Sequence, residues 1–165
     1  MNTAVASRQQ RGFTLVELII VILIIGILSA LALPRFIDMG KDARTAKAES
    51  IMGAVRSASQ VVRAASLVRT NTGATGNVTM DGLQINTNYG YPQATGPNGI
   101  VDAAGLDSGA TNNDQITFSA GGATAGTNIT IQVAGATAPA TCQVSYTSPA
   151  AANTSPNIQV ATGGC

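Results

Sequence analysis

The sequence predicts an α+β protein in which a long N-terminal α-helix packs on a C-terminal antiparallel β-sheet head. A helix-compatible stretch runs from residue 13 to about residue 69, and the remainder holds short β-rich segments between Gly, Pro and Ser/Thr clusters. Such a helix would be about 85 Å long, too long for one compact domain, so half of it must be buried outside its own head. We therefore expect a lollipop-shaped chain with four segments: a leader (1–12), an apolar helix buried in a membrane or among other subunits (13–34), an amphipathic stem (35–69) and a globular head (70–165).

The composition excludes several classes of protein. Only 10% of the residues are charged, and histidine and tryptophan are absent. This argues against a charge-rich disordered tail, a basic nucleic-acid-binding domain and histidine-based chemistry. The charges are also segregated, because the stem carries seven bases and three acids while the head carries four acids and neither Lys nor Arg. Nucleic-acid binding by the head is therefore disfavoured, and the basic stem and acidic head are complementary between neighbouring subunits.

The N-terminal stretch can span a membrane. Leu18–Leu33 is an uncharged run of 16 residues, and the mostly apolar stretch beginning at Phe13 is 21 residues long. As a helix it would extend about 31 Å, close to the thickness of a bilayer's hydrocarbon core. Arg8 and Arg11 precede it, so the leader should stay in the cytoplasm.

Three ordinary interpretations compete for this stretch. A secretory signal peptide could be cut after Ala30-Leu31-Ala32, although Pro34 follows the candidate site closely. A simple signal anchor explains the length but gives no role to Glu17, whose burial in a membrane centre would cost about 2.5 to 3.5 kcal/mol. A buried core helix would need more protein around it than this chain has. Cleavage between Gly12 and Phe13 would also give Glu17 a role, because the new α-amino group would lie one helical turn from Glu17, in the same chain or a neighbour.

These residues resemble a known family. The run Arg11-Gly12-Phe13-Thr14-Leu15-Val16-Glu17-Leu18, followed by an apolar helix, resembles the N-terminal signature of type IV pilins and of type II secretion pseudopilins. The resemblance implies that a prepilin peptidase cuts after Gly12 and N-methylates Phe13, and that Glu17 docks incoming subunits. It further implies that Gly26 and Pro34 loosen the helix in the filament, in line with their low helix propensity.

Further segments are similar to the mannose-sensitive haemagglutinin (MSHA) subgroup of type IVa pilins. They are Tyr89–Thr95 leading to Gly99-Ile100, Pro34–Ile37, Asp42–Ala46 and Thr162–Cys165. The resemblance implies a non-enzymatic homopolymer, held in the inner membrane of a Gram-negative bacterium and then assembled by pilus machinery into an extracellular filament for adhesion and surface colonisation. A type II secretion pseudopilin in a periplasmic pseudopilus is the alternative, and a monomeric membrane-anchored adhesin is another.

The stem after Pro34 has an amphipathic pattern near its end. Apolar positions at three- and four-residue steps predict one buried face: Ile51, Ala54, Val55, Ala58, Val62, Ala65 and Val68. Polar positions predict the opposite, solvated face: Arg56, Ser59, Gln60, Arg63 and Ser66.

The head should form strands joined by hairpins after a polar connection at Thr70–Gly76. The predicted strands are Gln115–Ser119, Asn128–Val133, Cys142–Thr147 and Asn157–Ala161. A disordered low-complexity head is the alternative. Cys142 and Cys165 are the only cysteines, and in an exported chain they most simply form a disulfide, as the resemblance also implies.

Nothing in the sequence indicates catalysis or a cofactor. It has no histidine for a triad, no nucleophile elbow and no phosphate-binding loop. Asp102, Asp107 and Asp114 could supply oxygen ligands to Ca²⁺, but they do not fit an EF-hand loop. Acidic residues in Gly-rich turns more often bond their own backbone.

Overall fold

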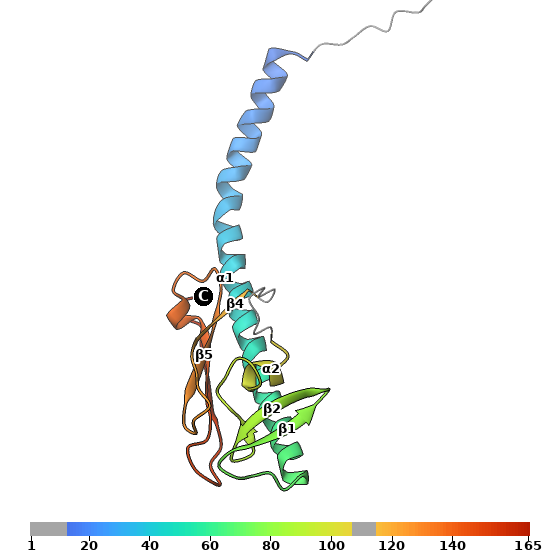
Figure 1. Ribbon diagram of the computed structural model, residues 1–165. Coiled ribbons are helices and arrows are strands. Elements are labelled where there is room, and N and C mark those ends of the chain that lie inside the picture. The colour runs from blue at the N-terminus through green and yellow to red at the C-terminus, as the bar shows by residue number, and fades with distance from the viewer. Residues whose placement is uncertain (1–12, 107–114) are drawn as a thin grey trace, which may run out of the picture. The chain divides into compact units, whose positions relative to one another are not determined.

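The computed structural model describes residues 13–106 and 115–165, apart from the side chains of residues 33–38 and 120. The chain divides into two compact units, the first ending at Met39 and the second spanning Gly40–Cys165. The prediction of an α+β protein with a long N-terminal helix and antiparallel strands is confirmed (Figure 1).

Helix α1 spans Leu15–Val68 and belongs to both units. At its start the Thr14 hydroxyl accepts a hydrogen bond from the Glu17 backbone N–H at 3.3 Å. Thr14 is therefore an N-cap, and the spacing Thr-x-x-Glu is that of a capping box. At its end Asn71 N–H donates to the Ser66 carbonyl and Thr70 N–H to the Leu67 carbonyl, with Thr70 at φ 52°. This is a Schellman-type cap with threonine where glycine is usual.

The buried face of α1 in the second unit differs from the predicted one. Ile51, Val55, Ala58 and Val62 are buried as predicted, and Ala48 is buried as well. Ser59 and Ser66, predicted to be solvated, are fully buried, whereas Val68, predicted to be buried, is 86% exposed. The prediction was wrong there because small hydroxyl side chains let the head approach the helix closely, and because Val68 is the last residue of α1.

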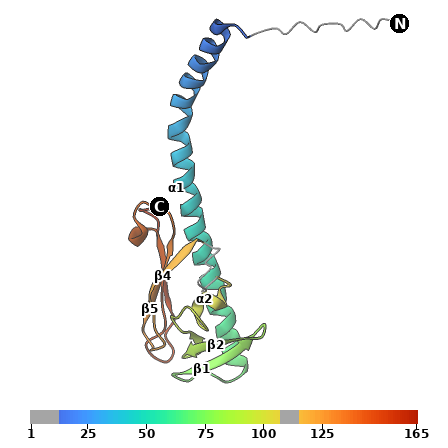
Figure 2. The same cartoon turned by 45° about the horizontal axis from the view of Figure 1, so that its top comes forward.

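The four-stranded sheet follows the predicted segments. Strands β4 (Ile116–Ala120), β5 (Asn128–Val133), β6 (Gln143–Thr147) and β7 (Asn157–Ala161) pair antiparallel in chain order. A short 3₁₀ helix, η1 (Pro139–Thr141), precedes β6, so that strand begins one residue after Cys142. Figures 1 and 2 show this sheet running beside the second half of α1.

A second, three-stranded sheet was not predicted. It consists of β1 (Gly76–Met80), β2 (Leu83–Asn88) and β3 (Tyr91–Pro92) and is followed by the short helix α2 (Ile100–Ala103). Each of its two connections is a two-residue turn with positive φ at both positions: Asp81-Gly82 and Tyr89-Gly90. This is the type I′ geometry that suits hairpins.

The core of the second unit joins these elements. Buried residues of α1, α2 and the four-stranded sheet form one apolar cluster, and Val62, Val78 and Ile85 form a smaller one beneath the three-stranded sheet. Tyr146 on β6 is fully buried, and its hydroxyl donates a hydrogen bond to the Pro92 carbonyl at 2.7 Å. Burial, and secondarily Tyr91, raises the pKa of Tyr146 well above the usual value, so the hydroxyl remains a donor. This bond ties β6 to β3.

Candidate functional site: the apolar helix and the stapled head

The first half of α1 presents an apolar surface on all sides. Leu15–Ala32 has a mean hydropathy of 3.0 and meets the length and composition of a membrane span, and none of its residues is buried in the structure. Phe13, just before the helix, is 80% exposed. A helix that is apolar all round needs lipid or other helices around it.

Glu17 is the single charged side chain on this surface among Phe13–Ala32. It lies in the first turn of α1, where a carboxylate is favoured by the helix dipole and by the capping-box pattern. The Thr14 cap was not predicted, although the Thr-x-x-Glu spacing is a signal for it. Glu17 thus has a local role at the helix start and remains available as an acceptor for a positive group.

The residues predicted to loosen the helix lie inside it. The helix is continuous through Gly26 and Pro34. An added Cβ at Gly26 would meet nothing within 4 Å, so this glycine leaves open space on the helix surface. The predicted cleavage residue Gly12 lies outside the described residues.

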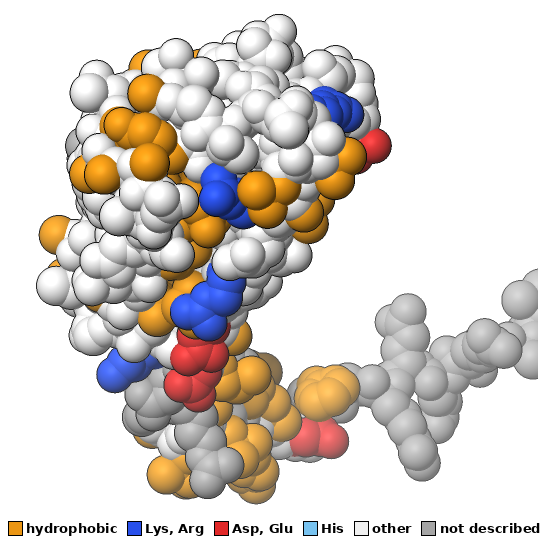
Figure 3. Space-filling view, turned by 90° about the horizontal axis from the view of Figure 1, so that it is seen from below, with side chains coloured by type: hydrophobic (Ala, Val, Ile, Leu, Met, Phe, Trp, Pro, Cys, Tyr) orange, Lys and Arg blue, Asp and Glu red, His pale blue; other side chains and the backbone are white. Residues whose placement is uncertain are grey.

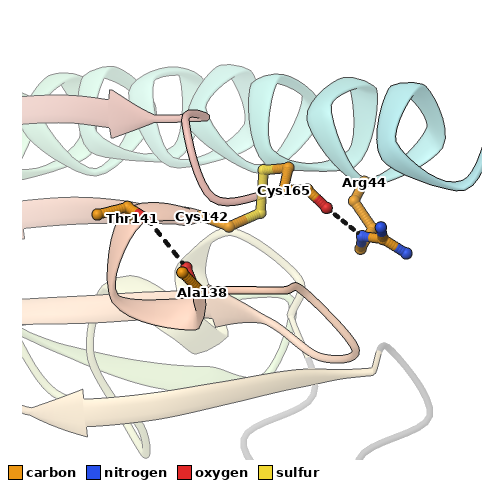
Figure 4. The surroundings of a disulfide bond; sticks show 5 residues. All are labelled: Arg44, Ala138, Thr141, Cys142 and Cys165. Atoms are coloured by element: carbon orange, nitrogen blue, oxygen red, sulfur yellow. Dashed lines mark hydrogen bonds between the residues drawn. A yellow bond between two sulfur atoms is a disulfide. The ribbon is translucent and has the colours of Figure 1, made fainter. Parts of the chain in front are cut away.

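The disulfide predicted from the two cysteines is present between Cys142 and Cys165, 23 positions apart. Both residues are buried in the main core cluster. Figure 4 shows the bridge beside α1, where Arg44 Nε donates to the Cys165 carbonyl at 2.5 Å. Gly164 adds two backbone hydrogen bonds of 3.0 Å to the η1 region, one with Ala138 and one with Thr141. The tail is thereby attached to both β6 and the helix.

A second link joins α1 to the three-stranded sheet. The Arg63 guanidinium donates to the Tyr89 carbonyl at 2.5 Å and lies 4.9 Å from the centre of the Tyr91 ring. Gly90 is buried at φ 79°, and a Cβ there would lie 3.2 Å from Ser66 Cβ. The Tyr89-Gly90 turn can therefore lie against the helix because Gly90 and Ser66 are small.

Of the three acidic residues considered for Ca²⁺, the structure describes only Asp102. Asp102 lies in α2, where its carboxylate accepts a hydrogen bond of 2.7 Å from the Asn98 backbone N–H. Asp107 and Asp114 lie outside the described residues. Among residues 13–106 and 115–165, no group of three or more His, Cys, Asp or Glu side chains could hold a metal ion.

A small cavity opens on the three-stranded sheet. It has a volume of about 190 Å³ and is lined by Met80, Asp81, Leu83, Ile85, Asp102 and Ala103. The β1–β2 hairpin supplies four of these side chains and α2 supplies two. Two carboxylates thus stand beside an apolar wall, in a head without Lys or Arg.

The basic side chains of the second unit all belong to α1 or follow it directly. Figure 3 shows Lys and Arg side chains as separate patches on a face where most side chains are uncharged. Arg44 and Arg63 are half-buried and bonded to the head, whereas Lys41, Arg56 and Arg69 are exposed.

Comparison with known proteins finds one family model and several relatives that are similar to this chain. The family "Prokaryotic N-terminal methylation motif" matches residues 7–33. A Thermus thermophilus protein, "Type IV narrow pilus major component PilA5", is 56% identical over 48 residues, which is 29% of this chain and 41% of that protein. A Pseudomonas aeruginosa "Fimbrial protein" is 42% identical over 53 residues, or 32% of this chain and 34% of that protein. The chain thus spans less than half the length of these two relatives.

A longer match extends into the head. The Eikenella corrodens "Fimbrial protein EcpC" is 33% identical over 108 residues, covering 64% of this chain and 69% of that protein. No solved structure matches the chain significantly.

Proposed function

Because this chain belongs to the type IV pilin family, we propose that it is a structural, non-enzymatic subunit that polymerises with copies of itself into a type IV pilus. The observation that carries the proposal is the exposed apolar helix Leu15–Ala32 with Glu17 in its first turn. Such a surface suits lipid before assembly and neighbouring helices afterwards. The pseudopilin alternative is not favoured, since the relatives named above are pilus and fimbrial proteins.

Processing at the N-terminus would supply the partner of Glu17. In this proposal a prepilin peptidase cuts between Gly12 and Phe13 and N-methylates Phe13. The resulting cationic amine pairs with the Glu17 carboxylate of an adjacent copy. An unpaired charge in an apolar medium is costly, so this pairing favours one register of docking. Gly26 and Pro34 would allow the helix to loosen as it packs in the filament.

The proposed cellular location of the chain follows from the same processing and assembly steps. We propose that the unassembled chain resides in the inner membrane of a Gram-negative bacterium, and that pilus assembly machinery moves it into a surface filament used for adhesion. Assignment to the MSHA subgroup stays a prediction, since the relatives named above are type IV pilus or fimbrial proteins without that designation.

Mass spectrometry of fibres sheared from intact cells tests the processing. We expect a chain that begins at N-methylated Phe13 with Cys142 and Cys165 oxidised. A chain that keeps residues 1–12, or one that begins at Leu33, would refute the proposal. Recovery of processed chain only from the periplasm would instead favour the pseudopilin.

A pair of matched variants tests the role of Glu17. Glu17→Gln removes the negative charge but keeps the size and the helix, so we expect processed chain to accumulate in the membrane with few fibres. Glu49→Gln makes the same change at an exposed position of α1 in the second unit and should assemble normally. Equal fibre yields from the two variants would exclude Glu17 as the docking residue.

A further inference from the structure

The end of α1 meets the three-stranded sheet through a small apolar contact. Val62, Val78 and Ile85 are its buried residues, whereas the main cluster joins α1 to α2 and to the four-stranded sheet and also holds the disulfide. Figures 1 and 2 show β1 and β2 beside the last turns of α1. Less buried apolar surface therefore stabilises this part of the head than the part on the four-stranded sheet.

Three buried oxygen atoms at or beside this contact have no hydrogen-bond partner among the described residues: Ser66 Oγ, Thr87 Oγ1 and Asn88 Oδ1. Ser66 and Thr87 are 0% exposed and Asn88 is 1% exposed. Ser66 follows Val62 by one helical turn, and Thr87 follows Ile85 by two residues, so both hydroxyls extend the faces that meet at the small cluster. A buried oxygen without a partner disfavours the closed arrangement, because water would satisfy it after opening.

The segment 71–88, which holds β1 and β2, has its two ends close together. The Tyr89 N–H donates to the Gly73 carbonyl at 2.8 Å, and Arg63 of α1 donates to the Tyr89 carbonyl. Thr70 and Tyr89, which flank the segment, have φ values of 52° and 49°, a strained backbone for residues with a Cβ. A segment whose ends stay together can leave its packing surface as a unit without rearranging the rest of the chain.

Backbone hydrogen bonds to the following segment oppose this movement. The Asn86 N–H donates to the Asn98 carbonyl at 2.8 Å, and the Asn86 carbonyl accepts from the Gln93 N–H at 2.9 Å. The four-stranded sheet is held more firmly, because the disulfide attaches the tail to the strand region and Arg44 attaches it to α1. The two parts of the head therefore differ in the contacts that keep them on the helix.

We infer that residues 71–88 form a flap that opens from α1 as a unit while the four-stranded sheet stays folded on the helix. Opening lets water reach the unpartnered oxygens of Ser66 and Thr87 and uncovers the inner face of the β1–β2 hairpin. The flap gives the head a closed and an open surface. The inference concerns a single chain, so it goes beyond the proposed function and does not depend on it.

Hydrogen exchange of the isotope-labelled full chain in detergent, followed by NMR, tests the flap. We expect the paired amides of β1 and β2 to exchange about tenfold faster, or more, than those of β5 and β6. Their rates should change little in dilute urea, since local opening exposes little surface. Equal exchange in the two sheets, or a urea dependence as steep as that of global unfolding, would overturn the inference.

Two variants test the role of the unpartnered hydroxyls, and each is an independent reading if the other folds poorly. Thr87→Val replaces the hydroxyl with a methyl group of similar size, and Ser66→Ala removes the other hydroxyl. Each should slow exchange in β1 and β2 about fivefold or more, because the closed flap no longer buries that oxygen, and should leave β5 and β6 unchanged. Thr79→Val makes the same change at an exposed position of β1 and is the matched control, with exchange rates close to those of the wild-type chain.

Two outcomes of this comparison would overturn the inference. Faster exchange of β1 and β2 in both Thr87→Val and Ser66→Ala would mean that the hydroxyls are hydrogen-bonded in the closed state. Equal slowing in all strands would mean that the variants change global stability and that the flap does not open by itself.

Discussion

The Arg63 link between α1 and the head can be tested by replacing Arg63 with Met. This change keeps much of the aliphatic stem but removes the N–H donor to the Tyr89 carbonyl and the cation near the Tyr91 ring. A hydrogen bond from a charged donor contributes about 1.5 to 3 kcal/mol, and a cation–π contact of a half-buried Arg about 1 kcal/mol. Because the two contacts share one side chain, their contributions are not additive. We expect the free energy of unfolding to fall by about 2 to 3 kcal/mol.

The assay is urea unfolding of the full chain in detergent. All three tyrosines lie in the head and tryptophan is absent, so tyrosine near-ultraviolet circular dichroism reports head unfolding. With an m-value of about 2 kcal/mol per molar urea, the midpoint should fall by about 1 M or more. Arg63→Lys should recover part of the loss, because it keeps the charge near the ring.

Arg56→Met is the matched control, since Arg56 is exposed on the same helix. Its midpoint should change little, because surface substitutions usually stay within about 0.5 kcal/mol. An Arg63→Met midpoint equal to that of Arg56→Met would refute the assignment of Arg63 as the link between helix and sheet.

Three further predictions concern the second unit. Tyr146→Phe should lower the free energy of unfolding in urea by about 1 to 3 kcal/mol, because it leaves the Pro92 carbonyl without its donor. Since the folded-state pKa of Tyr146 is raised, the contribution of Tyr146 to stability should be constant up to about pH 10 and then fall, and a pH series should show a weaker fall for Tyr146→Phe. Reduction of the Cys142–Cys165 bridge should lower the unfolding free energy by about 3 kcal/mol, and a midpoint unchanged by reductant would contradict this. Gly53→Ala should stabilise the isolated chain by about 0.5 to 1 kcal/mol, since the site is helical and open, whereas Gly90→Ala should destabilise it because φ is 79°. Thermal melts in detergent measure both variants, and a melting temperature higher for Gly90→Ala than for Gly53→Ala would contradict the prediction.

The elements that could be predicted are those whose sequence signals are periodic. The apolar run and the stem pattern predicted α1, and alternation predicted β5 and β7 with the observed bounds. The cysteine pair was also predictable, because the sequence offers only one pairing.

The unpredicted parts depend on short turns and on tertiary contacts. Asp81-Gly82 is a strong hairpin signal between two β-compatible runs, and using it would have predicted β1 and β2. Tyr89-Gly90 gives a weaker signal, because tyrosine rarely adopts positive φ, and the turn is held by Arg63 from 26 positions away. The burial of Ser59 and Ser66 could not be predicted from hydropathy, since it reflects close approach of the head to the helix.

The exposed apolar surface of Leu15–Ala32 has a thermodynamic consequence for the proposed exchange between membrane and fibre. Acyl chains and neighbouring helices are equally apolar, so moving this helix from one to the other removes almost no hydrocarbon from water. The heat-capacity change of that transfer should therefore be near zero, unlike that of an association from water, which is strongly negative. The hydrophobic effect then keeps the helix out of water but gives the exchange no direction. In the proposed function, direction would come from close packing, from the proposed charge pair at Glu17 and from work supplied by the proposed assembly machinery.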